Sequence, residues 1–462
     1  MTSAAPTPER AGDPAFPQRR PNYTLRRLSA LGIAILLALL GYTAAVALAP
    51  LPQLHPALAV DADTTEQAVS LDETKAKAAV EAQSLPTAIG WADPERDGIG
   101  SIEDDSPIWS NDRKAYPIAS ITKLVTVLVG LEKQPLAPGE NGPMYTYGEA
   151  DRAREAELRG LDAIMHPVPV GSRFSTRELL ELMLLPSSND YAIAYAHWVF
   201  GDNAGYRSAV ETWAKRHGLS SLRVVEPSGL DAGNVANAAD LVRLGRIALQ
   251  NPTVREIARL KTATIPGVGK VVSTNPLLGS VKGVTGLKTG SLDAAGFNLL
   301  ASQTVKVMGR ELVQISATLA RPTREARADS GREMLAEMAA MPKRKRIVTK
   351  GEELGSVRTW QGESVSLLAA EDARAVLAPA EHVLRTVEVG KTGVISYEGG
   401  RSVFGTIEMH GRSALKAGSP VGSVRFDGPG NLAPVDVVLG SAIAEPDLWW
   451  RMTHPAEVFG WG

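Results

Sequence analysis

The sequence contains no cysteine, which excludes disulfide bonds, thiolate nucleophiles and cysteine-ligated metal sites. Aromatic residues make up only 5% of the 462 residues, and the net charge of −2 leaves no excess of either sign. This near-neutral balance gives no reason to expect a nucleic-acid partner. The seven histidines show no metal-ligand spacing, so we predict neither a metal nor another cofactor. The length is sufficient for two or three domains, each with its own core.

Charged residues are also absent from residues 28–49, a run about long enough to span a bilayer. Two arginine pairs, at 19–20 and 26–27, precede the run, which places its N-terminal side in the cytoplasm and the chain beyond it outside. We therefore predict a disordered cytoplasmic tail over residues 1–27 and a single-pass signal anchor in the cell membrane. A cleaved signal peptide is the alternative, but the long tail and Pro50 after Ala-Leu-Ala argue against cleavage.

Residues 50–85 contain three prolines near their start and few apolar residues, so we expect a stalk without a core. Over residues 86–340, strand patterns at both ends enclose helical patterns. The expected helices are 176–185, 190–199, 238–249 and 324–341, and the expected strands include 98–102, 284–290, 298–303 and 311–319. Strands at both ends with helices between them predict a layered α/β (α+β) domain.

A basic run, Pro342-Lys-Arg-Lys-Arg, follows this domain, and we interpret it as a solvated hinge. Beyond it, short β-type runs alternate with glycine turns, which predicts a small all-β domain over residues 341–462. The last stretch of the chain, from Asp447, carries several aromatic residues. Such residues suit a bilayer interface, but we expect these to pack onto the β-domain.

Ser120 and Lys123 open an apolar segment that we expect to be a buried helix, and positions i and i+3 of a helix share a face. A serine hydroxyl needs an adjacent base to become a nucleophile, and a lysine can be that base when burial lowers its pKa. Alone, this spacing indicates no more than a helix cap beside a surface lysine, because it arises often by chance. The position of Lys123 inside an apolar run fits a surface lysine less well.

Two further short motifs follow. Ser187-Ser-Asn189 comes directly after Pro186, in a loop between two predicted helices where side chains can reach a cleft. Lys288-Thr-Gly290 lies on a predicted strand, where the glycine allows close approach of another backbone and Lys288 supplies positive charge. Taken singly, turn residues explain the first motif equally well, and an ordinary edge strand explains the second.

The three motifs, in this order, are those of β-lactamases and penicillin-binding proteins. The surrounding residues match too. Four segments are similar to D-alanyl-D-alanine carboxypeptidases: Pro117-Ile-Ala-Ser-Ile-Thr-Lys-Leu, Leu184-Leu-Pro-Ser-Ser-Asn-Asp, Ser228-Gly-Leu-Asp and Gly286-Leu-Lys-Thr-Gly-Ser-Leu-Asp. Residues 86–340 therefore resemble that family, and residues 351–370 resemble the start of its second domain.

The resemblance implies a β-lactamase/transpeptidase-like domain with a central antiparallel sheet, and an acyl-enzyme mechanism. In it Ser120 is the nucleophile, Lys123 its general base and Ser187 a proton shuttle. The implied substrate-binding residues are Asn189, Lys288, Thr289, Gly290, Ser291 and Arg324, with Arg327 as the alternative to Arg324. Thr289 and the arginine would hold a carboxylate, and the backbone N–H groups of Ser120 and Ser291 would stabilise the oxyanion.

The implied reaction removes terminal D-alanine from peptidoglycan stem peptides, and β-lactam antibiotics would acylate the same serine. A β-lactamase or a DD-endopeptidase on this site is one alternative. A catalytically silent, wall-binding scaffold is another, and the intact motif set argues against it. The residues leave open which stem peptide is preferred.

Two positions depart from the family pattern. Ser188 stands where the family often has glycine, and we expect its side chain to point outward. Glu226 precedes a proline, as does the deacylating glutamate of class A β-lactamases, and a glutamate near an acyl-ester can orient water. The context Glu226-Pro-Ser-Gly-Leu-Asp fits the carboxypeptidases instead, so we interpret Glu226 as a surface or structural carboxylate.

Overall fold

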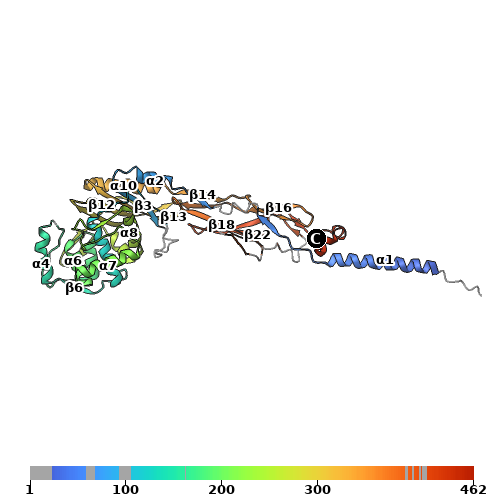
Figure 1. Ribbon diagram of the computed structural model, residues 1–462, viewed down its shortest axis with the longest axis horizontal. Helices are drawn as coiled ribbons and strands as arrows, with labels where there is room; N and C mark the ends of the chain where they lie inside the picture. The colour runs from blue at the N-terminus through green and yellow to red at the C-terminus, as the bar shows by residue number, and fades with distance from the viewer. Residues whose placement is uncertain are drawn as a thin grey trace, which may run out of the picture.

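The protein is elongated, with a mixed α/β domain at one end, a β-rich domain in the middle and a single long helix at the other end (Figure 1). The computed structural model describes residues 23–58, 68–92, 106–161, 163–390, 394–397, 400–404, 407 and 414–461. Residues 1–22 of the predicted tail and the predicted strand at 98–102 lie outside the described residues.

A five-stranded antiparallel sheet forms the centre of the α/β domain, in the order β11-β12-β13-β3-β4. Its strands are β3 (Thr87–Ala92), β4 (Ile108–Ser110), β11 (Val284–Leu292), β12 (Gly296–Val307) and β13 (Arg310–Arg321). Because β3 precedes the helices along the chain and β11 to β13 follow them, the sheet joins both ends of the domain, as the sequence predicted. The predicted strands at 284–290, 298–303 and 311–319 are confirmed.

Helices cover the sheet on both faces. On one face, α8 (Ala238–Gln250) packs on β3 and β13, and its Gly245 lies against Leu300 of β12. On the opposite face, α10 (Arg324–Ala340) packs on β12 and β13, with α2 (Thr74–Glu81) beside it. The other helices of the domain are α3 (Thr122–Lys133), α4 (Glu149–Arg159), α5 (Thr176–Leu184), α6 (Asn189–Phe200), α7 (Asn203–Arg216) and α9 (Pro252–Ala258), and the 3-10 turn η3 (Ala119–Ile121) precedes α3. Three two-stranded ribbons complete it: β5 (Tyr116–Pro117) with β8 (Val235–Ala236), β6 (Met144–Thr146) with β7 (Arg173–Ser175), and β9 (Thr262–Ile265) with β10 (Gly269–Val272).

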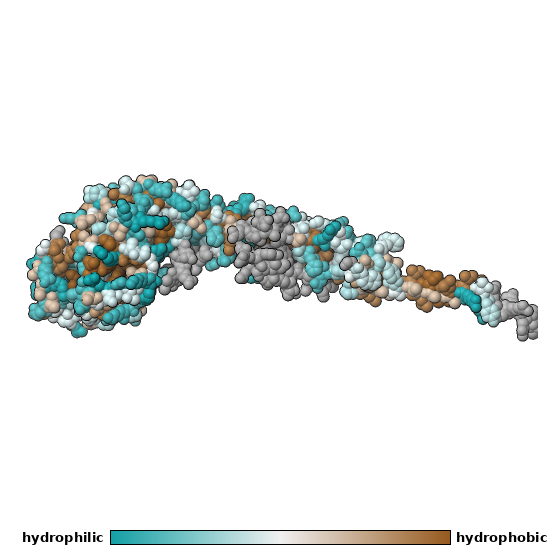
Figure 2. Space-filling view, in the orientation of Figure 1, coloured by the Kyte–Doolittle hydropathy of each residue, from teal (hydrophilic) through white to brown (hydrophobic). Residues whose placement is uncertain are grey.

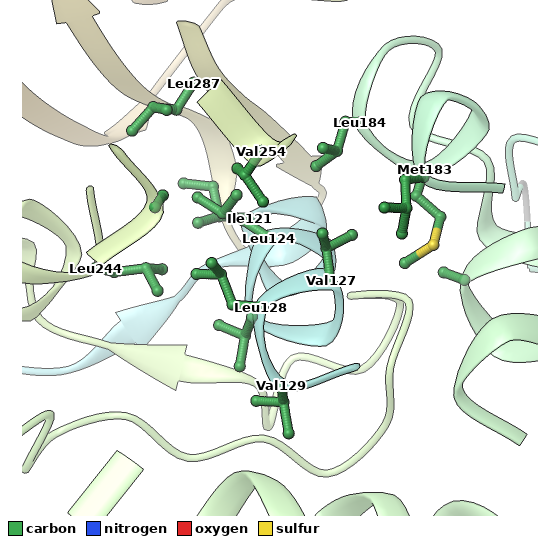
Figure 3. Close-up of a cluster of buried hydrophobic side chains, with 14 of the residues drawn as sticks. Ile121, Leu124, Val127, Leu128, Val129, Met183, Leu184, Leu244, Val254 and Leu287 are labelled. Carbon is green, nitrogen blue, oxygen red and sulfur yellow. The ribbon is translucent and has the colours of Figure 1, made fainter. Parts of the chain in front are cut away.

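Helix α3 runs through the hydrophobic core of this domain. Apolar side chains from α5, α8, α9 and β11 surround it, among them Met183, Leu244, Val254 and Leu287 (Figure 3). All residues from Thr122 to Leu131 are buried, so the helix is apolar on every face, as its sequence predicted. Lys123, within this buried stretch, is itself fully buried, and its burial determines the chemistry described below.

The helix boundaries follow capping signals that the sequence carries. The Ser175 hydroxyl accepts a hydrogen bond from the Glu178 backbone N–H and the Glu178 carboxylate accepts one from the Ser175 N–H, which forms the predicted capping box. The Asn237 side chain accepts from the Asp240 N–H and caps α8. The predicted helices over 176–185, 190–199, 238–249 and 324–341 are confirmed to within one or two residues.

The β-rich domain contains one large sheet and two short ribbons. The sheet runs β1-β15-β16-β23-β22-β18-β20-β19, and β2 pairs with β18. Its strands are β1 (Pro56–Leu58), β2 (Val69–Ser70), β15 (Glu353–Arg358), β16 (Ser364–Ala369), β18 (His382–Val389), β19 (Val394–Tyr397), β20 (Gly400–Phe404), β22 (Pro420–Asp427) and β23 (Val435–Leu439). The ribbons are β14 (Lys343–Val348) with β17 (Ala373–Leu377) and β21 (Ala414–Leu415) with β24 (Ile443–Ala444).

Two sequence predictions fail in this region. The segment over 50–85 was expected to be a stalk without a core, but β1 and β2 join the β-sheet, and Leu54, Ala76 and Val80 are buried. Few apolar residues suffice because each meets a core built by other elements. The basic run after Pro342 is no hinge either: it forms β14, whose backbone pairs with β17 while its cationic side chains remain largely at the surface.

The long helix α1 (Tyr23–Leu48) begins within the predicted tail and covers nearly all of the predicted span. Its large apolar side chains are exposed over most of its length, and Figure 2 shows it as a continuous hydrophobic rod. Within the described residues it is the helix long and apolar enough to cross a membrane. Its C-terminal end contacts the short helix α11 (Leu448–Thr453), on which a second short helix, α12 (Pro455–Phe459), packs.

Candidate active site

Ser120 lies in the 3-10 turn η3 that leads into α3, at a point where two other backbones come very close. Ala119 has a φ of 49°, which places a residue with a Cβ in the left-handed region, where strain is concentrated at functional sites. A Cβ on Gly229 would lie 2.2 Å from the Ala119 carbonyl oxygen, and one on Gly290 would lie 2.5 Å from the Ile118 carbonyl oxygen. Both glycines are therefore required for β11 and the 226–231 loop to close around Ser120.

Lys123 is fully buried, and its Nζ contacts the hydroxyl of Ser120. The Nζ donates to Ser120 Oγ across 2.9 Å and to the Ser228 carbonyl oxygen across 2.5 Å. Burial lowers the pKa of Lys123 to about 7, while Glu226 and Asp190 act in the opposite direction. A sizeable fraction of Lys123 is therefore neutral near neutral pH. In that neutral form the amine can accept the proton of the Ser120 hydroxyl, which it contacts.

The second and third motifs meet each other. Lys288 on β11 donates from Nζ to Ser187 Oγ across 2.9 Å and to its neighbour's carbonyl oxygen, on Thr289, across 3.1 Å. The pKa of Lys288 is lowered strongly by burial, and further by the positive charges of Lys123 and Arg327. Ser187 has a φ of 70°, a second strained position beside the site. The Thr289 hydroxyl is hydrogen-bonded to that of Thr274 at 2.6 Å.

Asn189 is held by the protein at both ends of its amide. Its Nδ2 donates to the Ser228 carbonyl oxygen at 3.3 Å, and its Oδ1 accepts from the Ile164 N–H at 3.0 Å. Asn189 is 2% exposed. These contacts favour a structural role, in which Asn189 fixes the loop around Lys123, over the expected grip on a substrate backbone.

The Ser188 side chain does not point outward, and that prediction is wrong. Ser188 is fully buried, and its hydroxyl is hydrogen-bonded to Nδ1 of His166 at 2.7 Å. Asp190, two residues after Ser188, accepts from the His166 backbone N–H, and burial raises its pKa to about 6. Sequence reasoning missed both His166 and Asp190. A polar residue in place of the usual glycine was the available signal that a hydrogen-bonding partner exists.

Glu226 is occupied on both carboxylate oxygens. Oε2 accepts from the backbone N–H and the hydroxyl of Ser228, at 2.7 and 2.6 Å. Oε1 accepts from the Gly229 N–H at 2.5 Å and from Asn234 Nδ2 at 2.8 Å. The interpretation of Glu226 as a structural carboxylate fits these contacts, whereas a glutamate that orients water needs a free oxygen.

The two candidate arginines on α10 differ sharply. Arg324 is exposed, and Arg327 is 5% exposed with its guanidinium 5.8 Å from the centre of the Phe297 ring. Its Nε has no hydrogen-bonding partner among the described residues, although the group is buried. Burial and the charge of Arg324 lower its pKa to about 10, so Arg327 stays cationic at neutral pH. The structure thus favours Arg327 over Arg324 as the carboxylate ligand.

These contacts assemble a nucleophile, a buried amine at hydrogen-bonding distance, and a second cation beside it. Comparison with known proteins agrees with that chemistry. The family model described as D-alanyl-D-alanine carboxypeptidase matches residues 109–318. This part of the chain is similar to the D-alanyl-D-alanine carboxypeptidase family, as the motifs predicted. The chain is therefore an enzyme, a serine-type peptidase.

Individual proteins are similar to this chain over longer stretches than the motifs. The D-alanyl-D-alanine carboxypeptidase DacD of Salmonella typhimurium is 25% identical over 331 residues, which is 70% of this chain and 83% of that protein. A D-alanyl-D-alanine endopeptidase of Escherichia coli is 30% identical over 161 residues, or 35% of this chain and 49% of that protein. Penicillin binding protein 5 of Haemophilus influenzae shares the fold, with a TM-score of 0.50, 21% identity and coverage of 78% of this chain and 97% of that chain.

Proposed function

We propose that this enzyme removes the terminal D-alanine from peptidoglycan stem peptides through an acyl-enzyme on Ser120. The observation that carries the proposal is the contact between Ser120 Oγ and the buried Lys123 amine, whose pKa lies at about 7. A base with that pKa is available at neutral pH and strong enough to take a hydroxyl proton during attack.

In the proposed acylation step, neutral Lys123 accepts the Ser120 proton as Oγ bonds to the carbonyl carbon between the two D-alanines. The backbone N–H groups of Ser120 and Ser291 stabilise the oxyanion that forms. Collapse of this intermediate breaks the C–N bond. The departing D-alanine nitrogen takes a proton from the hydroxyl of Ser187, which Lys288 holds by a hydrogen bond, and the proton that Lys123 removed from Ser120 replaces it. Water then hydrolyses the ester and regenerates Ser120.

Positive charge on one side of the site suits a substrate with a free C-terminal carboxylate. Lys288 contacts the backbone of Thr289 and lies within the electrostatic influence of Arg327, whose Nε has no hydrogen-bonding partner among the described residues. We assign carboxylate binding to Thr289 and Arg327, with Gly290 leaving room for the peptide backbone against β11. A β-lactam carries an equivalent carboxylate and would acylate Ser120 in the same pose.

We further propose that α1 anchors the enzyme in the cell membrane as a single span, with the catalytic domain outside the cytoplasm. The 26 residues of α1 suffice to cross a bilayer, and arginines flank its N-terminal end. Figure 1 places the catalytic domain at the opposite end of the molecule from α1, with the β-domain as a spacer.

A DD-endopeptidase is the second candidate, and the 30% identity to the Escherichia coli endopeptidase favours keeping it. A β-lactamase fits less well, since Glu226 has no oxygen free to orient water. Full-length enzyme in nanodiscs should release D-alanine from a peptide ending in D-Ala-D-Ala and be inhibited by benzylpenicillin. Cleavage of cross-linked dimers without D-alanine release would establish the endopeptidase instead, and rapid turnover of penicillin would contradict both.

The two arginines of α10 allow a matched test of carboxylate binding. Arg327→Ala is expected to lower kcat/KM for the peptide about ten- to a hundredfold, because a hydrogen bond to a charged group contributes about 1.5–3 kcal/mol. Arg324→Ala, on the same helix, should leave the rate near that of the wild type. For a peptide with an amidated C-terminus the Arg327→Ala penalty should vanish. Equal losses in both variants would show that neither arginine grips the carboxylate.

A further inference from the structure

The C-terminal helix α11 lies against the last turns of α1, far from the catalytic domain, and α12 packs on α11 (Figure 1). The Tyr42 hydroxyl donates to the Met452 carbonyl oxygen at 2.6 Å. Val46 is fully buried there, in contrast to the exposed apolar residues earlier in α1. The segment after α1 is held as well, since Trp360 of the β-domain donates from Nε1 to the Pro52 carbonyl oxygen at 2.8 Å.

Arg451 caps the end of α1. Its Nη1 lies 3.3, 3.5 and 3.0 Å from the carbonyl oxygens of Val46, Ala47 and Ala49, and the residue is only 9% exposed. The last carbonyls of a helix lack intrahelical partners and carry the negative end of its dipole, so a guanidinium there satisfies both. This contact ties the far end of the chain to the end of the hydrophobic rod.

Beside this contact, α11 and the residue after α12 expose large apolar side chains. Trp449 is 73% exposed, Trp461 is 74% exposed, and Leu448 is 48% exposed. The sequence analysis expected these aromatics to pack onto the β-domain, and for Trp449 and Trp461 that expectation is wrong. Tryptophan is enriched at membrane–water interfaces, because its indole has an apolar body and an N–H that reaches polar groups.

We propose that α11 and α12 form a membrane-contacting foot, defined as residues 448–461, which clasps the outer end of α1 and sets Trp449 and Trp461 into the lipid headgroup layer. The partner is the bilayer surface, because α11, which carries the exposed Trp449, packs directly on the end of the hydrophobic helix α1. The inference rests on the proposed anchor. With its foot on the bilayer and Trp360 bonded to the segment after α1, the β-domain is held at a fixed angle to the membrane.

The absence of cysteine allows a direct test with single-cysteine variants of the full chain. Trp449→Cys and Trp461→Cys, each labelled with an environment-sensitive fluorophore, are compared in nanodiscs with Lys350→Cys, an exposed position on the β-domain. Leu37→Cys, inside α1, reports the anchor itself. The expected result is strong quenching at 449 and 461 by lipids spin-labelled near the headgroup, quenching at 37 by lipids spin-labelled deep in the acyl chains, and none at 350 by either.

Quenching at 37 with none at 449 or 461 would overturn the foot and leave the anchor standing. No quenching at 37 would overturn the anchor and the foot with it. If a second copy of the chain covered the indoles, 449 and 461 would stay unquenched by lipid, which again overturns the proposal. Arg451→Met is expected to weaken the quenching at 461 while D-alanine release from a soluble peptide stays unchanged.

A second inference rests on the contacts of Glu226. Its carboxylate holds the N–H groups of Ser228 and Gly229, and the Ser228 carbonyl oxygen in turn accepts from Lys123 Nζ. The Nζ therefore lies between that carbonyl oxygen and Ser120 Oγ, and Glu226 determines where the carbonyl points. We infer that Glu226 is a positioning residue that aims the amine of Lys123 at Ser120.

The inference depends on Lys123 as the base, and the pH profile of penicillin acylation tests the two separately. Glu226→Gln keeps the side-chain length but cannot accept all five hydrogen bonds, so acylation should slow about ten- to a hundredfold. The negative charge of Glu226 also raises the pKa of Lys123. Its removal should move the acidic limb of the profile to lower pH, which a loss of folded enzyme would not do.

Asp231→Asn is the matched control, since it removes a carboxylate from the same loop. The Oδ1 of Asp231 accepts a hydrogen bond only from the Gly233 N–H among the described residues. This variant should keep the wild-type limb. Suppose that acylation by the wild-type enzyme rises with pH near 7, and that Glu226→Gln shows the same rise at the same rate. That result would overturn the positioning role of Glu226 alone. A wild-type profile without that limb would count against Lys123 as the base, and thus against both proposals.

Discussion

Lys123→Met is expected to slow the acylation of Ser120 by benzylpenicillin by about 10²–10⁴-fold, the contribution of a well-placed general base. Lys123 is fully buried in an apolar helix, and methionine fills a similar volume without a charge to desolvate, so the fold should keep or gain stability. The rate is measured with a fluorescent penicillin on full-length enzyme, and the thermal midpoint is recorded on the same samples.

Lys133→Met provides the control, because it makes the same change at the exposed end of α3. It should acylate at the wild-type rate. The wild-type rate should itself rise with pH through about 7, since only neutral Lys123 accepts the serine proton and protonation at lower pH removes it. A Lys123→Met enzyme that acylates normally would mean that another group activates Ser120.

Gly290→Ala is expected to reduce acylation about 10²–10³-fold, the effect of losing an oxyanion donor, without unfolding the domain. The added Cβ would lie 2.5 Å from the Ile118 carbonyl oxygen and 3.2 Å from the Ser120 backbone nitrogen. These are backbone atoms that cannot rotate away, so β11 must move outward from the turn that carries Ser120. The acylation rate and the thermal midpoint together measure the effect.

Gly160→Ala is its control, because the new Cβ there makes ordinary contact, at 3.5 Å, with the Glu157 carbonyl oxygen. It should change neither rate nor stability appreciably. Should Gly290→Ala acylate as fast as Gly160→Ala, the close approach of β11 to the Ser120 turn would have no part in catalysis.

Most of the catalytic domain was predictable because its signals are local. The capping residues Ser175 and Asn237 fix where helices begin, and the apolar faces of α3 show that it is buried. The pairing of Ser120 with Lys123 follows from helical spacing. The contact between Ser187 and Lys288 does not, since 101 residues separate them, and the family resemblance placed both in one site without predicting that they touch.

What the sequence could not supply were contacts between distant segments. Ser188 can be buried because its hydroxyl is hydrogen-bonded to His166, which lies 22 residues earlier in the chain. Arg327 is buried and Arg324 is exposed because of the way α10 packs on the sheet. The sequence shows only two arginines in one helix and does not tell them apart. Leu54 has a core to enter only because the β-domain, built from residues far along the chain, folds back to meet it.

The most direct test of the central claim is mass spectrometry of the full-length enzyme after brief exposure to benzylpenicillin. The account predicts one covalent penicilloyl group per chain, located on the peptide that contains Ser120, and absent from Ser120→Ala. The absence of any adduct, or an adduct on another residue that persists in Ser120→Ala, would contradict the claim that Ser120 is the nucleophile.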